Sequence, residues 1–341
     1  MAGRFDPLTR TAIRGGRTDI PQPHPQPHPP EGPAPRARER EWTPDGPLEL
    51  GLTLGPLRHG PGDPTFRTTP DGSVWLGTRT PTGPATLRLT RTADRTVTAA
   101  AWGPGTEWAL DALPALLGAD DDPAVFVPRH RLVHASHRRR PGLRLTRTGL
   151  VLQSLIPTVL EQKVTTDEAY RAWRRLVRQY GERAPGPHPD LYVMPDPRTW
   201  TLIPSWDWHK AGVDAKRSAT IVRAARVAPR MEEAAAMDLP AAVARLEAVP
   251  GIGPWTSAET LQRSNGAADA VTTGDLHLPG TIGYALTGDR DADDAAMLHL
   301  LAPYADQGGG QRHRAARLIL LAGRTPPRRT PRMPRGDIGL L

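Results

Sequence analysis

A glycine-rich segment between two helical patterns places the strongest constraint on the fold of this chain. The residues before it carry apolar side chains at helical spacing: Leu239, Val243, Leu246 and Val249. Pro250-Gly251 ends that pattern, and Gly253 permits a tight reversal. A second helical run starts at Trp255. The sequence thus predicts a helical hairpin with bare backbone at its tip. The first amides of the second helix lack a helical acceptor, which makes the tip a suitable seat for a phosphate.

Three further segments accompany the hairpin. They are residues 159–165, residues 211–217 and residues 271–279, in which Asp275 stands nineteen residues after Thr256. Together with the hairpin, these segments resemble the helix-hairpin-helix DNA glycosylases of base-excision repair, most closely the 3-methyladenine DNA glycosylase II group. The resemblance implies that the hairpin holds the DNA backbone without reading sequence, and that a damaged nucleotide is flipped into a cleft.

The resemblance also implies an α+β fold: a mainly all-α helix-hairpin-helix glycosylase body with a small N-terminal antiparallel β-rich domain. Residues 1–45, which include a stretch of alternating Pro, Gln and His, have little to bury and are expected to be a disordered leader. Residues 46–120 are expected to form the small α+β domain and residues 121–323 the helical body. Residues 324–341 are expected to be a basic tail.

Apolar and polar residues alternate within the N-terminal domain. The candidates for one buried face of a sheet are Val74, Leu76, Leu87, Leu89, Val97, Ala99 and Ala101. Asp71-Gly72 and residues 81–83 supply turns. This pattern predicts three to five antiparallel strands, followed by an amphipathic helix near residues 107–117.

The amino-acid composition limits the kinds of partner and of chemistry that this chain can have. The net charge of +8 suits a polyanionic partner, although only three of the 44 basic residues are Lys and the excess of Arg also fits a GC-rich genome. The chain has no Cys, which excludes disulfides, cysteine zinc sites, thiol nucleophiles and cysteine-held iron–sulfur clusters. No apolar run approaches a membrane span, and no signal peptide is visible. We expect a monomeric bacterial protein of the cytoplasm, associated with the nucleoid and with no membrane partner.

Asp275 is the candidate catalytic residue. Its position before an apolar helical stretch also fits a helix N-cap, and the two roles agree, because amides at a helix start keep a carboxylate rigid and ionised. Cleavage of an N-glycosidic bond develops positive charge on the sugar, and a fixed anion beneath the sugar stabilises that charge.

Trp255 indicates the type of enzyme. Relatives that also nick the DNA strand carry a Lys one residue before the hairpin Thr, and this Lys forms a Schiff base with the sugar. Here Trp255 precedes Thr256, so an enzyme that uses water and leaves the strand intact is expected. The indole is a candidate wall of the base pocket, where it would attract a cationic alkylated purine, and a plain core position is the alternative.

The resemblance suggests further contacts. Gln162 and Lys163 match the position that fills the gap left by the flipped nucleotide, with an ordinary surface Lys as the alternative for Lys163. His277 is a candidate substrate contact or a packing residue. The expected contacts to the DNA backbone are Val249, Gly251, Ile252, Gly253, Thr256 and Arg312. No cofactor or metal is expected, apart from an optional monovalent cation at the hairpin carbonyls.

The expected function is that of a monofunctional DNA glycosylase. Such an enzyme hydrolytically releases alkylated purines, such as 3-methyladenine, from duplex DNA and leaves an abasic site. Two alternatives stay open: a non-catalytic helix-hairpin-helix DNA-binding protein, and a glycosylase of another base specificity, such as uracil or a mismatched base. Measuring base release separates the first alternative from an enzyme, and identifying the released base settles the second.

Overall fold

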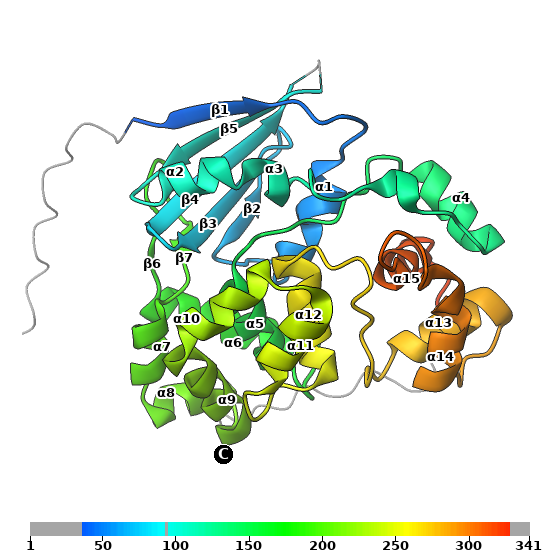
Figure 1. Cartoon of the computed structure of the whole chain (residues 1–341). Helices are drawn as coiled ribbons and strands as arrows, with labels where there is room; N and C mark the ends of the chain where they lie inside the picture. Colours follow the sequence, from blue (N-terminus) through cyan, green and yellow to red (C-terminus); the bar gives the residue numbers. More distant parts are fainter. Residues whose placement is uncertain (1–35, 93–94, 328–341) are drawn as a thin grey trace, which may run out of the picture. The chain divides into compact units, whose positions relative to one another are not determined.

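A five-stranded antiparallel sheet forms the N-terminal part of the chain in the computed structural model, which describes residues 36–92 and 95–327 (Figure 1). The strands are β1 (Arg38–Trp42), β2 (Phe66–Thr68), β3 (Val74–Thr80), β4 (Gly83–Arg91) and β5 (Val97–Trp102), in the spatial order β1-β5-β4-β3-β2. The buried face predicted from the alternating pattern is confirmed. Leu76 lies opposite Leu87 and Leu89 lies opposite Ala99, so that apolar side chains of neighbouring strands meet on one face.

Short elements cover both faces of this sheet. Leucines of α1 (Leu50–Leu54), α2 (Thr106–Asp111) and α3 (Leu113–Leu116) join the apolar cluster of the predicted face. The helix expected near residues 107–117 is thus divided into α2 and α3, with Pro114 in the first turn of α3. On the opposite face, the rings of Trp75 and Trp102 stack with their centroids 5.6 Å apart, and they pack with the small hairpin of β6 (Glu182–Arg183) and β7 (Tyr192–Val193).

The expected leader extends too far along the chain. Strand β1 lies within it and pairs with β5 along its whole length. Its alternating Arg and Glu residues favoured disorder, but charged residues are also typical of an edge strand, where they discourage pairing with another chain. Residues 1–35 and 328–341, which contain the rest of the expected leader and most of the expected tail, lie outside the described residues.

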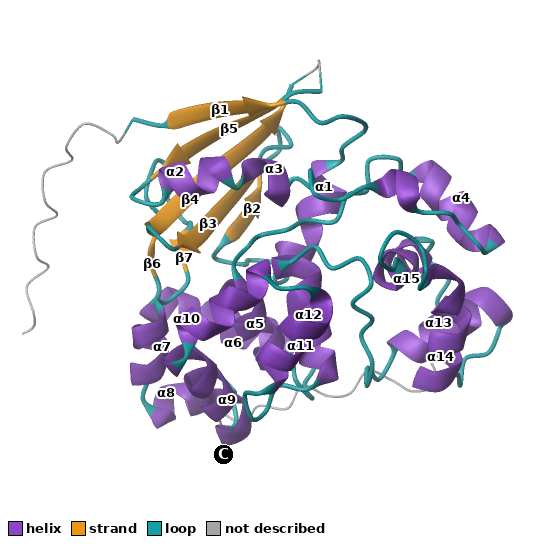
Figure 2. Cartoon of the chain, viewed as in Figure 1, coloured by secondary structure: helices purple, strands orange, loops and turns teal. Residues whose placement is uncertain are grey.

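Helices dominate the chain from residue 151 onward (Figure 2). The first group is α5 (Val151–Leu160), α6 (Thr166–Tyr180), α7 (Pro197–Leu202), α8 (Ser205–Lys210), α9 (Ala215–Arg226), α10 (Ala228–Glu232), α11 (Leu239–Glu247) and α12 (Pro254–Ser264). Its core includes the buried indoles of Trp173, Trp200 and Trp208. Short 3-10 helices are η1 (Gly55–Leu57), η2 (Pro123–Val125), η3 (Glu233–Ala236) and η4 (Ala302–Tyr304).

A second helical group has a core of its own. It consists of α4 (Arg131–Arg139), α13 (Leu278–Thr287), α14 (Asp294–Leu301) and α15 (Arg312–Leu321). The rings of Phe126 and Tyr304 stack inside it at 5.5 Å between centroids. The segment from α12 to α13 joins the two helical groups and carries Asp275, so this residue lies where the two cores are connected. No helix in the described residues is long and apolar enough to cross a membrane.

Candidate functional site

The predicted hairpin lies between α11 and α12. Gly251 has a φ of +102°, and a Cβ atom at this position would lie 2.0 Å from Thr220 Oγ1, so the turn requires glycine here. Gly253 is the N-cap of α12, and a Cβ added to it would meet no atom within 4 Å beyond its chain neighbours. Pro254 occupies the first turn of α12, where a missing amide costs little. The fold of the turn therefore depends on Gly251, whereas Gly253 leaves an open surface at the tip.

The tip carries free amides, as the sequence predicts. In the part of the chain that the structure describes, no oxygen accepts from the amides of Gly251, Gly253, Trp255 and Thr256. The amides of Val249 and Ile252 are different, because they donate to carbonyls of the preceding turn and the side chains of both residues are buried. Val249 and Ile252 thus anchor the hairpin in the core and offer no donor to a phosphate, in contrast to their expected role.

Two long side chains brace the hairpin from neighbouring elements. Gln162 Nε2 donates to the carbonyl of Gly251 at 3.0 Å and to Thr256 Oγ1 at 2.8 Å. Arg223 donates to the carbonyl of Pro250 at 3.0 Å. The amide of Gln162 is therefore engaged with the hairpin, a role that the sequence did not indicate. A monovalent cation at the carbonyls of Gly251 and Pro250 would compete with the donors from Gln162 and Arg223. Among residues 36–92 and 95–327, no group of three His, Asp or Glu side chains could hold a metal ion.

Asp275 lies just before α13 and is held by three donors. Its Oδ1 accepts from the amides of His277 at 2.8 Å and Leu278 at 2.7 Å, and its Oδ2 accepts from Trp255 Nε1 at 3.0 Å. Burial raises the pKa of the Asp275 carboxyl, but the hydrogen bonds from His277, Leu278 and Trp255 outweigh burial and leave the pKa below its ordinary value. Asp275 is thus a fixed carboxylate that is ionised at neutral pH, as expected for a residue at a helix start.

A cleft of about 270 Å³ opens beside Asp275. Its polar lining comes from α12, from the segment that leads into α13, from α13 itself and from α15: Glu259, Gln262, Thr272, Asp275, His277, Thr281, His313 and Arg317. The volume approaches the roughly 300 Å³ at the lower end of small-molecule pockets. Trp255 does not line the cleft, and it contacts Asp275 through the edge of its indole instead of offering a wall to a base.

The α15 wall of the cleft combines a neutral imidazole with a guanidinium. Burial and the positive charges of Arg317, Arg263 and Arg314 lower the pKa of His313 well below its ordinary value. Burial, with Arg263 and Arg314, also lowers the pKa of Arg317, to about 10. At neutral pH, His313 is therefore uncharged and able both to donate and to accept, whereas Arg317 keeps its charge.

Arg312 has a partner that the sequence did not predict. Its Nε donates to Asp269 Oδ1 at 2.8 Å, a second guanidinium nitrogen bonds Oδ2, and its backbone amide donates to the same carboxylate. Asp269 therefore both caps the start of α15 and holds Arg312. Because Asp269 engages the guanidinium from two of its nitrogens and fixes its orientation, we assign Arg312 to the fold instead of the expected DNA contact.

Lys163 and His277 are members of the expected site whose side chains are exposed. Lys163 has a φ of +56°, a left-handed conformation that is uncommon for residues other than glycine. It lies two residues before Thr165, which forms a capping box with Glu168 at the start of α6. Backbone strain of this kind persists where the surrounding structure imposes it, often at functional sites. His277 lies at the rim of the cleft, with its amide held by Asp275.

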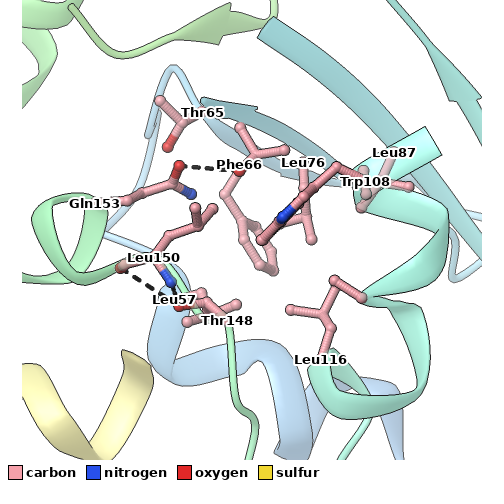
Figure 3. Close-up of a pocket in the computed structure, with 13 residues that line it drawn as sticks. Leu57, Thr65, Phe66, Leu76, Leu87, Trp108, Leu116, Thr148, Leu150 and Gln153 are labelled. Carbon is pink, nitrogen blue, oxygen red and sulfur yellow. Dashed lines mark hydrogen bonds between the residues drawn. The ribbon is translucent and has the colours of Figure 1, made fainter. Parts of the chain in front are cut away.

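A second cavity lies between the sheet, α2, α3 and α5 (Figure 3). Mainly apolar side chains surround it, among them Leu57, Phe66, Leu76, Trp108 and Leu150. Gln153 at its edge accepts a hydrogen bond from Thr78 at 2.9 Å. Its volume of about 40 Å³ is far below the roughly 300–1,000 Å³ of small-molecule pockets, so we regard it as a packing gap.

The hairpin, the helical groups and the sheet together form a fold that this chain shares with solved DNA glycosylases. The chain is similar to the 3-methyladenine DNA glycosylase from Archaeoglobus fulgidus, with 15% identity and a TM-score of 0.68 over 83% of this chain and 98% of that chain. It is also similar to the 8-oxoguanine glycosylase/lyase of Clostridium acetobutylicum in complex with double-stranded DNA, with 11% identity and a TM-score of 0.64 over 82% of this chain and 92% of that chain. No family model and no curated protein sequence matches the chain.

Proposed function

We propose that this chain is a monofunctional DNA glycosylase that releases alkylated purines, such as 3-methyladenine, from duplex DNA. The observation that carries the proposal is the Asp275 carboxylate, which three donors hold at the edge of a cleft. The fold shared with a 3-methyladenine glycosylase and an 8-oxoguanine glycosylase/lyase supports the coarser part of the proposal, a DNA glycosylase.

Binding to DNA begins at the hairpin. The free amides of Gly251, Gly253, Trp255 and Thr256 offer donors to a phosphate, and the N-terminus of α12 adds the favourable end of its dipole. These contacts recognise the backbone of any sequence. The damaged nucleotide then leaves the base stack and enters the cleft beside Asp275, while the exposed side chain of Lys163 fills part of the gap.

Release of the base needs an anion and a water molecule. The bond between sugar C1′ and the base nitrogen breaks, and its electron pair leaves with the base. Asp275 stabilises the positive charge that develops on the sugar. Water then adds to C1′, and its proton passes to the Asp275 carboxylate and on to solvent. A cationic alkylated purine departs as a neutral molecule, so the step requires no general acid.

The strand stays intact in this mechanism because the site offers water and no amine at the position of the Schiff-base Lys. Trp255 occupies that position, and its indole N–H is engaged with Asp275. An indole has no nucleophilic nitrogen that could attack the sugar. The reaction therefore stops at the abasic site.

Incubation of the protein with methylated duplex DNA tests the proposal, with mass spectrometry to identify the released bases and gels to follow the strands. We expect 3-methyladenine among the products and strand breaks only after hot alkali. DNA binding without release of any base would favour a non-catalytic DNA-binding protein. Release of uracil or of a mismatched base alone would reassign the specificity. A covalent complex trapped by borohydride, and lost when one Lys is replaced, would disprove the monofunctional mechanism.

A further inference from the structure

A second carboxylate lines the cleft, and the proposed reaction does not use it. Glu259 stands on α12 four residues after Trp255, so the two residues share one face of the helix. The side chain of Glu259 is 19% exposed, and it lies in the same cleft as Asp275. A partly desolvated carboxylate in a cleft requires hydrogen-bond donors. Its orientation determines where a bound ligand has to place its own N–H groups.

A chain of hydrogen bonds sets that orientation. Gln262 Nε2 donates to the carbonyl of Ala270 and to Thr272 Oγ1, both at 2.8 Å. Because a carbonyl only accepts, the amide nitrogen of Gln262 must face it, and the Thr272 hydroxyl is left to donate to Glu259 Oε1, at 2.7 Å. Arg263 donates to Glu259 Oε2 at 2.8 Å. Both oxygens of Glu259 are therefore acceptors in a fixed position.

One lone pair on each oxygen of Glu259 remains for a ligand, because a carboxylate oxygen has two and each has one partner in this network. The pairing with Arg263 offsets the charge of Glu259 locally, so the directions of the hydrogen bonds select the ligand more than net charge does. No Phe, Tyr or Trp is among the residues that line the cleft in the described part of the chain, so hydrogen bonding has to supply the selectivity that stacking would otherwise share.

We infer that the carboxylate of Glu259 accepts hydrogen bonds from the edge of the flipped base and selects purines that present two adjacent N–H donors. It would therefore favour alkylated guanines over alkylated adenines. This inference rests on the proposed function. Guanine presents its N1–H beside its 2-amino group, and the two oxygens of a carboxylate accept both. Adenine presents its 6-amino group beside a ring nitrogen that accepts, and that nitrogen meets a carboxylate oxygen unfavourably. Alkylation at N7 makes the guanine ring cationic and strengthens its two donors.

Methylated duplex DNA provides the test, because the same molecules carry N7-methylguanine and N3-methyladenine. The rate of enzymatic release of each base is divided by its spontaneous rate in the same DNA. For the wild-type protein we expect the larger acceleration for N7-methylguanine. Glu259→Gln replaces one acceptor by a donor, and it should lower the ratio of guanine to adenine release by roughly 10- to 100-fold. The matched control is Glu233→Gln, which also removes a carboxylate paired with an Arg but lies outside the cleft.

The outcomes distinguish this inference from the proposed function. If the wild-type protein releases neither base, the proposed function fails and the inference fails with it. If it releases both but accelerates N3-methyladenine more, the inference fails and the function stands, whether or not the variant folds. An equal loss of both activities in Glu259→Gln would make Glu259 a residue that only positions the Thr272 segment, and would also overturn the inference.

Discussion

The indole Nε1–H of Trp255 donates to Asp275 Oδ2 at 3.0 Å, which links the first turn of α12 to the residue that leads into α13. The position that the sequence resemblance assigns to a Schiff-base Lys therefore holds, in this chain, a neutral donor to the candidate catalytic carboxylate. A donor of this kind favours the ionised form of Asp275 and restricts its rotation. In the proposed mechanism, Trp255 thus leaves no amine for a Schiff base and helps to keep Asp275 ionised.

Trp255→Phe should shift the acid limb of the pH profile to higher pH. In the proposed mechanism Asp275 acts as an anion, so base release should be lost as the pH falls through the pKa of Asp275. Burial raises this pKa, and the hydrogen bonds from His277, Leu278 and Trp255 lower it below the ordinary value of 3.8; without the indole donor the pKa rises. Single-turnover release from pH 3 to 8, corrected for spontaneous release, measures the shift. Trp206→Phe on α8 is the control, and an acid limb that stays in place would show that the indole does not tune Asp275.

Asp275→Asn should fold and bind DNA but lose base release. The Asn oxygen still accepts from the amides of His277 and Leu278, whereas its NH₂ group faces the donor of Trp255, at a cost of about 1 kcal/mol in stability. Loss of the anion should slow single-turnover release by roughly 100-fold or more. Asp289→Asn, which changes a carboxylate bonded to a backbone amide away from the cleft, should retain activity. Rates near wild type for Asp275→Asn would end its catalytic assignment.

Gly253→Ala and Gly251→Ala should separate DNA contact from folding. The Gly253 methyl group meets no atom of the protein but occupies the tip of the hairpin, so we expect an unchanged melting temperature and weaker binding to damaged and undamaged duplex alike. Each lost phosphate contact should reduce the salt dependence of binding by about 0.9 log unit per tenfold change in salt. Gly251→Ala should instead destabilise the fold by about 1–3 kcal/mol, because its φ and the contact with Thr220 exclude a side chain. Wild-type affinity in Gly253→Ala would argue against phosphate binding at the tip.

Lys163→Gly should slow base release and leave stability nearly unchanged. Glycine relieves the left-handed strain of about 1 kcal/mol at this position. It also raises the conformational entropy of the unfolded chain, which lowers the stability by a similar amount. Loss of the side chain that fills the gap should slow flipping, which a fluorescent base analogue next to the lesion reports. Lys163→Arg keeps a long side chain and should release bases at close to the wild-type rate. Equal flipping in Lys163→Gly and the wild type would reduce Lys163 to a surface residue.

Arg312→Gln should reduce stability and leave the salt dependence of DNA binding unchanged. The side chain shares two hydrogen bonds with Asp269, and their loss should cost about 1–3 kcal/mol. Asp269→Asn removes the same pair, so the double substitution should destabilise less than the sum of the single ones. Chemical unfolding of the four proteins measures this coupling. A normal melting temperature together with a smaller salt slope in Arg312→Gln would return this residue to the DNA interface.

Local patterns in the sequence predicted the features that neighbouring residues determine. The buried face of the sheet follows from alternation in β3, β4 and β5, and the hairpin follows from the two glycines between helical runs. Asp275 was placed correctly at a helix start, because capping is also local. The edge strand β1 escaped detection, since its charged residues pair with β5, a strand more than fifty residues later in the chain.

Partners that are distant in the chain explain the remaining differences. Gln162 and Arg312 have side chains that suit DNA contact, yet the first bonds Gly251, 89 residues away, and the second bonds Asp269, 43 residues away. No spacing rule reveals such pairs. Glu259 was missed because the motif points only to Asp275. Its position four residues after Trp255, on the same helix face, was the signal available.

The connection of the two helical cores through the segment that carries Asp275 has a consequence for how this protein can change. The hairpin belongs to the core of α5 to α12, whereas the opposite wall of the cleft, on α15, belongs to the core of α13 to α15. Substitutions at the cleft face of α15, for example of Ala316, can therefore change the side chains that face a bound base. They should leave the hairpin, and with it the proposed contact to the DNA backbone, unchanged. Under the proposed function, substitutions on α15 would change which lesion is removed while the binding of the duplex stays the same.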